Sequence, residues 1–186
     1  MELLNQQRTL DQKFVDRKKE IEQLLLDAQS RALGDSETKE MLKTRAQMRE
    51  QPFPEFLKNA DAYEKLDMEI KSHTILVNTL PEYKILLDLT AYPETVSYLL
   101  AHENSHMNVA QQLAVPIDGY ALVVSKDEQG FHYLPFVAYE VPHHWDRKKQ
   151  IKAIMQIANA PDEYGNSLSP GDIETIEQSK NKLKKE

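Results

Sequence analysis

Apolar residues recur every three, four or seven positions over the first 33 residues, which is the period of an amphipathic helix. They are Leu3, Leu10, Phe14, Ile21, Leu24, Leu25, Ala28 and Ala32. Such a helix would be about 48 Å long, longer than a compact core of this size requires. Gly34-Asp35-Ser36 interrupts the pattern, and a second helix is predicted from Ser36 to about Gln51. We predict a helical hairpin over residues 1–51, which either packs on the core or forms a coiled coil that dimerises or binds a partner protein.

The rest of the chain alternates between helical and strand patterns. Pro52-Phe53-Pro54 marks a boundary, and residues 52–186 are expected to form one α+β domain. The patterns predict helices over 54–71, 81–89, 145–158 and from Ser169-Pro170 onward, and a strand over 73–79. Two strands, 119–125 and 131–140, flank turn residues and predict a β-hairpin, in which Pro135 indicates an edge strand or a bulge. The expected fold class is therefore α+β and mostly helical.

A further helix is predicted from Pro93 to about Ala114, because Pro93 suits a first helical position and Pro116 ends the pattern. Its apolar stripe consists of Val96, Leu99, Leu100, Met107, Ala110 and Leu113. His102, Glu103 and His106 fall on or beside this stripe. Two imidazoles and a carboxylate are therefore expected to face the protein interior.

Histidines at positions i and i+4 of a helix project from one face and can share one Zn²⁺. Glu103, at i+1, is then placed to take a proton from a metal-bound water. Because a carboxylate needs partners in an apolar setting, a metal ion with its water would satisfy it. A structural network remains the alternative, in which Glu103 accepts hydrogen bonds from a histidine or tyrosine.

The stretch Leu99-Leu-Ala-His-Glu-Asn-Ser-His-Met107 resembles the zincin superfamily of metallopeptidases. By this resemblance, His102 and His106 would bind zinc and Glu103 would be the general base. Val109 and Gln112 stand where the longer metzincin motif has glycine and its third histidine. The resemblance therefore implies a gluzincin-like or minimal zincin, with a third ligand further downstream.

A catalytic zinc has three protein ligands and an open position, so a third ligand is expected from the hairpin region. The candidates, in order of preference, are Glu140, His143, His132 and His144. His132 and Glu140 would lie about 26 Å apart on a regular strand, so both cannot reach one metal. Tyr139, or alternatively Tyr133, is a candidate hydrogen-bond donor to a developing oxyanion.

Composition narrows the classes of function. The 186 residues carry a net charge of −7, which disfavours nucleic-acid binding. Cysteine is absent, which excludes disulfides, thiolate metal sites and thiol catalysis. With no long apolar run and no signal-peptide pattern at its start, the chain is expected to be cytoplasmic and to bind no membrane.

The leading hypothesis is a zinc-dependent hydrolase, specifically a peptidase that acts on a peptide or protein substrate. The alternative is a non-catalytic interaction protein that works through its N-terminal helices. A third reading takes Glu103-x-x-His106 as half of a di-iron carboxylate site, which needs a second such helical motif. The other match is Glu140-Val-Pro-His143, and Pro142 suits a helix poorly.

Overall fold

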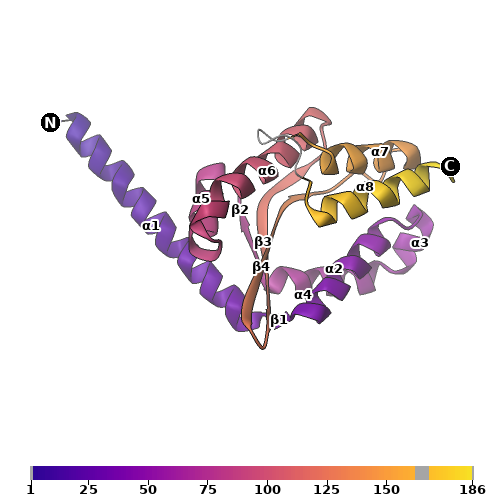
Figure 1. Ribbon diagram of the computed structural model, residues 1–186, viewed down its shortest axis with the longest axis horizontal. Helices are drawn as coiled ribbons and strands as arrows, with labels where there is room; N and C mark the ends of the chain where they lie inside the picture. Colours follow the sequence, from indigo (N-terminus) through magenta and orange to yellow (C-terminus); the bar gives the residue numbers. More distant parts are fainter. Residues whose placement is uncertain (1, 162–167, 186) are drawn as a thin grey trace.

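A small sheet built around strand β3 (Ile117–Asp127) lies at the centre of the computed structural model, which describes residues 2–161 and 168–185 (Figure 1). Strand β3 pairs antiparallel with β2 (Thr74–Val77) and β4 (Gly130–Tyr139), and parallel with the two-residue β1 (Leu33–Gly34). Among the described strands, β4 pairs only with β3 and is therefore an edge strand, as Pro135 predicted.

Helices surround this sheet and confirm the α+β class. They are α1 (Glu2–Arg31), α2 (Asp35–Arg49), α3 (Phe53–Lys58), α4 (Ala60–Ser72), α5 (Leu80–Thr90), α6 (Pro93–Gln112), α7 (Arg147–Ala158) and α8 (Pro170–Leu183). The predicted helix over 54–71 is interrupted at Asn59, so it forms α3 and α4. The 81–89 segment is helical, because Thr79 and Glu82 form a capping box at its start.

The two N-terminal helices do not form the predicted hairpin. They diverge from β1, with the start of α1 extending away from the body (Figure 1). The second half of α1 packs on α5 and the sheet, whereas α2 packs on α4. Ile21, Leu25, Ala28 and Ala32 are buried in the same core as β3 and α5, so this part of α1 packs on the core, which was one of the two predicted alternatives. A short apolar stripe creates a helix face without specifying which element covers it.

Helix α6 packs against β3 and β4 on one side and against α5 and α7 on others. Its partners explain why it buries polar as well as apolar side chains. Helices α7 and α8 run side by side (Figure 1) and bring the C-terminal part of the chain next to α6. Much of the predicted turn-rich connection over 161–170 lies outside the described residues. No helix in the described part of the chain is both long and apolar enough to cross a membrane.

One glycine shapes the strand pair beside α6. Gly119 has φ +144°, and a Cβ there would lie 2.4 Å from the Val77 carbonyl oxygen. At this point the β3–β4 register shifts, between Ile117 and Gly119. The bulge sets the end of β4, where Tyr139 pairs with Ile117.

Candidate metal centre

Helix α6 turns His102, Glu103 and His106 toward the interior, as the sequence predicted. These three residues are only 4%, 5% and 6% exposed, respectively. Burial on this scale is unusual for these residue types and requires polar partners. The partners come from β4, α7 and α8.

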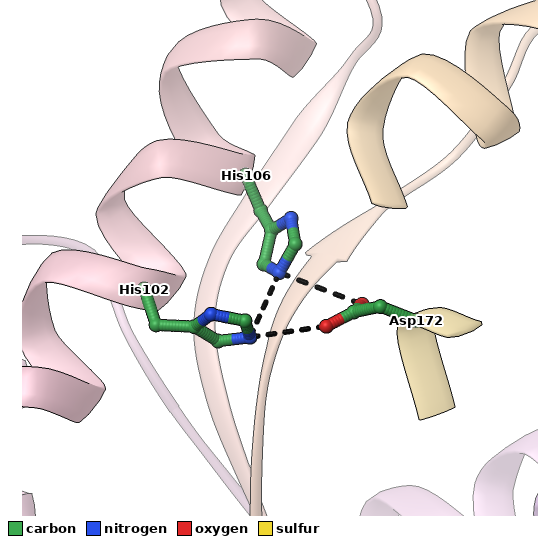
Figure 2. Close-up of side chains that lie close together, drawn as sticks. All are labelled: His102, His106 and Asp172. Carbon is green, nitrogen blue, oxygen red and sulfur yellow. Dashed lines mark hydrogen bonds and ion pairs between the residues drawn. The ribbon is translucent and has the colours of Figure 1, made fainter. Parts of the chain in front are cut away.

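Asp172 is the third member of the site and lies on α8, facing the two histidines (Figure 2). Pro170 begins α8, and Ser169 and Asp172 form a capping box in which the Ser169 hydroxyl donates to Asp172 Oδ2 at 2.6 Å. Asp172 Oδ2 is 3.1 Å from His102 Nε2, and Oδ1 is 3.5 Å from His106 Nε2. The two Nε2 atoms are 3.1 Å apart.

These separations fit one small cation. Tetrahedral ligands at the zinc–nitrogen and zinc–oxygen distances of about 2.0–2.1 Å lie about 3.3 Å from one another. The three measured separations of 3.1, 3.1 and 3.5 Å fall around that value. The donor set, two imidazoles and a carboxylate, is one that zinc accepts.

The protonation of His106 supports the same interpretation. Its Nδ1 lies 2.6 Å from the Ile157 carbonyl oxygen, so Nδ1 must carry the proton that it donates. In the neutral ring, Nε2 then presents a lone pair toward Asp172, which also presents lone pairs. Either a cation or an additional proton must lie between such groups. A backbone carbonyl that fixes the tautomer in this way is a common partner of metal-binding histidines.

Without a metal, the two buried histidines pair with Asp172, and this pairing favours their protonated forms. Hydrogen bonding to Asp172 raises the pKa of His102 above 6.5 and outweighs the opposing effect of burial. Burial lowers the pKa of His106, but its bonds to Asp172 and Ile157 raise it overall. Burial would raise the pKa of Asp172, yet hydrogen bonds from His102, His106 and Ser169 hold it far below its usual value.

We expect the chelator-treated protein to lose thermal stability as the pH rises above about 6.5, the ordinary pKa of a histidine. The pKa values of His102, His106 and Glu103 are all raised by folding, so the folded state binds more protons than the unfolded chain in this range. The lowered pKa of Asp172 contributes fully above 3.8 and adds no slope here. Melting curves in chelator and in excess zinc measure this effect. Zinc should stabilise most at the upper end, where protons no longer compete for the imidazoles. A melting temperature in chelator that does not fall would contradict this assignment.

Glu103 is the buried acid beside the histidines. Burial raises its pKa, although the two histidines and a backbone hydrogen bond from Val137 act in the opposite direction. A glutamate with a raised pKa is suited to accept and return a proton near neutral pH. The neighbouring Asn104 accepts a hydrogen bond from the Tyr120 hydroxyl at 2.9 Å, which ties this turn of α6 to β3.

A cavity of about 360 Å³, here named the metal-centre cavity, opens onto these four side chains. It is lined by His102, Glu103, His106 and Asp172 together with Leu42, Arg45, residues 134–137, Tyr139, Ile157, Ala158, Ser169, Gly171 and Thr175. A ligand can therefore reach the site between α2, β4 and α8.

No protein-family profile, curated protein or solved structure matches this chain. The resemblance to zincins therefore depends on residues 99–107 alone.

Of the residues predicted to complete the site, Tyr139 lines the metal-centre cavity, and burial raises its pKa to about 12, so its hydroxyl stays protonated. Glu140 and His143 do not join the two histidines. They lie beside one another, with Glu140 Oε1 3.6 Å from His143 Nε2, and line a different cavity. The third residue that the structure places beside the two histidines is Asp172, not a residue of the hairpin. The second half of a di-iron site is likewise not formed within the described residues.

The remaining candidates lie elsewhere. His132 contacts Asp127 at 2.7 Å near the hairpin turn, and His144 is exposed. The Tyr133 hydroxyl accepts a hydrogen bond from Gln29 of α1 at 2.7 Å. Asp172 was not considered from the sequence, where Ser-Pro-Gly-Asp indicates only the start of a helix. No local pattern reveals that this helix start faces α6.

Proposed function

We propose that this protein is a zinc-dependent hydrolase that cleaves peptide bonds. The observation that carries the proposal is the convergence of His102, His106 and Asp172, with separations that match the ligand set of one tetrahedral zinc. The HExxH spacing adds Glu103 to the same cavity. A zinc ion held there would lower the pKa of water and polarise a carbonyl oxygen.

Each side chain has a distinct task in this proposal. His106 is oriented by the Ile157 carbonyl, and Asp172 is oriented by Ser169, so both present acceptor atoms without rearrangement. Glu103 accepts the proton of the attacking water and passes it to the leaving amine. Tyr139 keeps its hydroxyl proton at neutral pH and can donate it in a hydrogen bond to the developing oxyanion.

The position of β4 favours a peptide as the substrate. The Val137 amide donates to Glu103, so the polar groups of Val137 point away from β3 toward the cavity. In an antiparallel pair the backbone polar groups of successive residues point alternately toward and away from the partner strand. Pro135, two residues before Val137, therefore also directs its carbonyl to the free edge. An extended peptide could bond to these carbonyls as it does to other exposed sheet edges.

Two measurements test the proposal. Elemental analysis of protein purified without chelator should find about one zinc per chain. A mixed-sequence peptide library analysed by mass spectrometry should show cleavage that stops with a zinc chelator and returns with added zinc. His106→Ala should abolish both, and His144→Ala, an exposed histidine, should affect neither. Protein without zinc and without chelator-sensitive cleavage would refute the proposal.

A second function, self-association through α1, is favoured by the exposed apolar side chains of that helix. Phe14, Val15, Leu24 and Leu26 are 41–58% exposed, and the helix extends from the body (Figure 1). We infer that a second copy of the chain covers them. Sedimentation should detect a dimer that Phe14→Ser and Leu26→Ser dissociate, whereas a monomer in the unaltered protein would contradict it.

A further inference from the structure

A second cavity, here named the arginine cavity, adjoins the metal-centre cavity. It has a volume of about 280 Å³ and lies between α2, α7, α8 and the end of β4. The two cavities share Leu42, Arg45, Tyr139 and Thr175 as lining residues. Along α8, Thr175, Ser179 and Lys182 line it at the spacing of one helix face, so this face leads away from Asp172.

Positive charge gathers in the arginine cavity although the chain as a whole has a net charge of −7. Its cationic lining residues are Arg45, Arg49, Arg147 and Lys182, and its acidic lining residues are Glu50 and Glu140. Two of these cations have acidic partners. Arg45 pairs with Asp67 at 3.1 Å, and Lys182 pairs with Glu50 at 2.5 Å.

Arg49 and Arg147 differ from Arg45 and Lys182 in their ion pairing. Within the part of the chain that the structure describes, neither guanidinium lies within ion-pair distance of a carboxylate. Arg49 is nevertheless held in place, since its Nε donates to the Tyr63 hydroxyl and its guanidinium lies 5.6 Å from the centre of that ring. Its charge also acts on Tyr139, in the wall shared with the metal-centre cavity, where it lowers the pKa that burial and Asp172 raise.

We propose that the arginine cavity binds a carboxylate of the substrate, so that the protein prefers acidic peptides. The guanidinium group suits this ligand, because its planar fork matches the two oxygens of a carboxylate. The choice of a peptide as the carrier of that carboxylate rests on the proposed function. The carboxylate belongs either to an acidic side chain or to the end of the peptide.

The fold sets the distance between this carboxylate and the cleaved bond. Thr175 and Lys182 lie three and ten residues beyond Asp172, which corresponds to about 5 and 15 Å along α8. An extended peptide advances about 3.3 Å per residue. The carboxylate therefore lies about two to four residues from the cleaved bond.

Fluorescence anisotropy tests this inference independently of catalysis. The probes are short, alanine-rich, fluorescein-labelled peptides that carry Glu or Gln two to four residues from a central bond, each with a free or amidated C-terminus. They are titrated against zinc-supplemented Glu103→Gln protein, which leaves the probe intact. We expect a carboxylate to tighten binding about tenfold or more. Comparing the Glu and Gln peptides detects recognition of a side-chain carboxylate. Comparing the free and amidated peptides detects recognition of a C-terminal carboxylate.

Variants locate the effect. Arg49→Gln and Arg147→Gln should each remove most of the preference for the carboxylate. Lys148→Gln is the matched control, because it makes the same charge change next to Arg147 but lines a different surface hollow. Equal binding of all four types of peptide, at every position of the Glu or Gln, would overturn the inference, as would a preference that survives both arginine changes. Zinc content and library cleavage are measured separately, so a failure here is distinguishable from a failure of the proposed hydrolase.

Discussion

Replacing Asp172 with asparagine should weaken zinc binding by more than about 100-fold, because loss even of a residue that only orients a ligand costs about 10–100-fold. Asparagine keeps the size of the side chain but removes the anionic oxygen that faces His102 at 3.1 Å. It also leaves the first turn of α8 with a residue that can still hydrogen-bond to Ser169. Titration against a chromophoric zinc chelator measures the change in affinity.

Two control variants make this experiment decisive. Glu140→Gln and His143→Gln alter the residues that the sequence favoured as third ligand, and the structure places both outside the metal-centre cavity. We expect both to bind zinc as the unaltered protein does. If Glu140→Gln lost zinc while Asp172→Asn kept it, the metal centre described above would be wrong.

Replacing Glu103 with glutamine should reduce the rate of peptide cleavage by about 10²- to 10⁴-fold, the usual contribution of a positioned general base. Zinc content should stay at the level of the unaltered protein, because Glu103 is not among the three converging ligands. Stability should not fall, because burial already disfavours the charged form of Glu103, and glutamine can still accept the Val137 amide. Cleavage of the peptide library at saturating zinc measures the effect.

The matched control is Glu94→Gln, an exposed glutamate in the first turn of the same helix. It removes the same charge from α6 without touching the cavity, so cleavage should be unchanged. A Glu103→Gln protein with full activity would exclude Glu103 as the base. One that lost its zinc would instead assign Glu103 a part in metal binding.

The sequence predicted the site residues correctly where the pattern of a single helix was sufficient. The positions of His102, Glu103 and His106 within α6 follow from helical periodicity between two prolines, and all three are buried as expected. The edge position of β4 followed in the same way from Pro135, whose nitrogen has no proton to bond a neighbouring strand.

Asp172 could not be predicted as the third candidate ligand, because its place beside the histidines depends on how distant elements pack. Glu140 was attractive for its place at a strand end, but it follows the last residue of β4 and lies beside His143 in the arginine cavity. Tyr139 lines the metal-centre cavity, and Glu140, one residue later, does not. Asp172 reaches the site only because α7 and α8 pack side by side next to α6.

The N-terminal helices show the same limit. The pattern of Ile21, Leu25 and Ala28 correctly indicated a buried face on α1. Nothing in it distinguished α2 from α5 and the sheet as the surface that covers that face.

The order of the ligands along the chain has a consequence for biosynthesis. His106 precedes Asp172 by 66 residues (172 − 106), which a ribosome adding about 5–20 residues per second makes in about 3–13 seconds. During that interval the nascent polypeptide carries His102, Glu103 and His106, but it lacks the Asp172 carboxylate. If the protein is the proposed hydrolase, it would be latent while it is being translated and would gain activity only when α8 has emerged and docked.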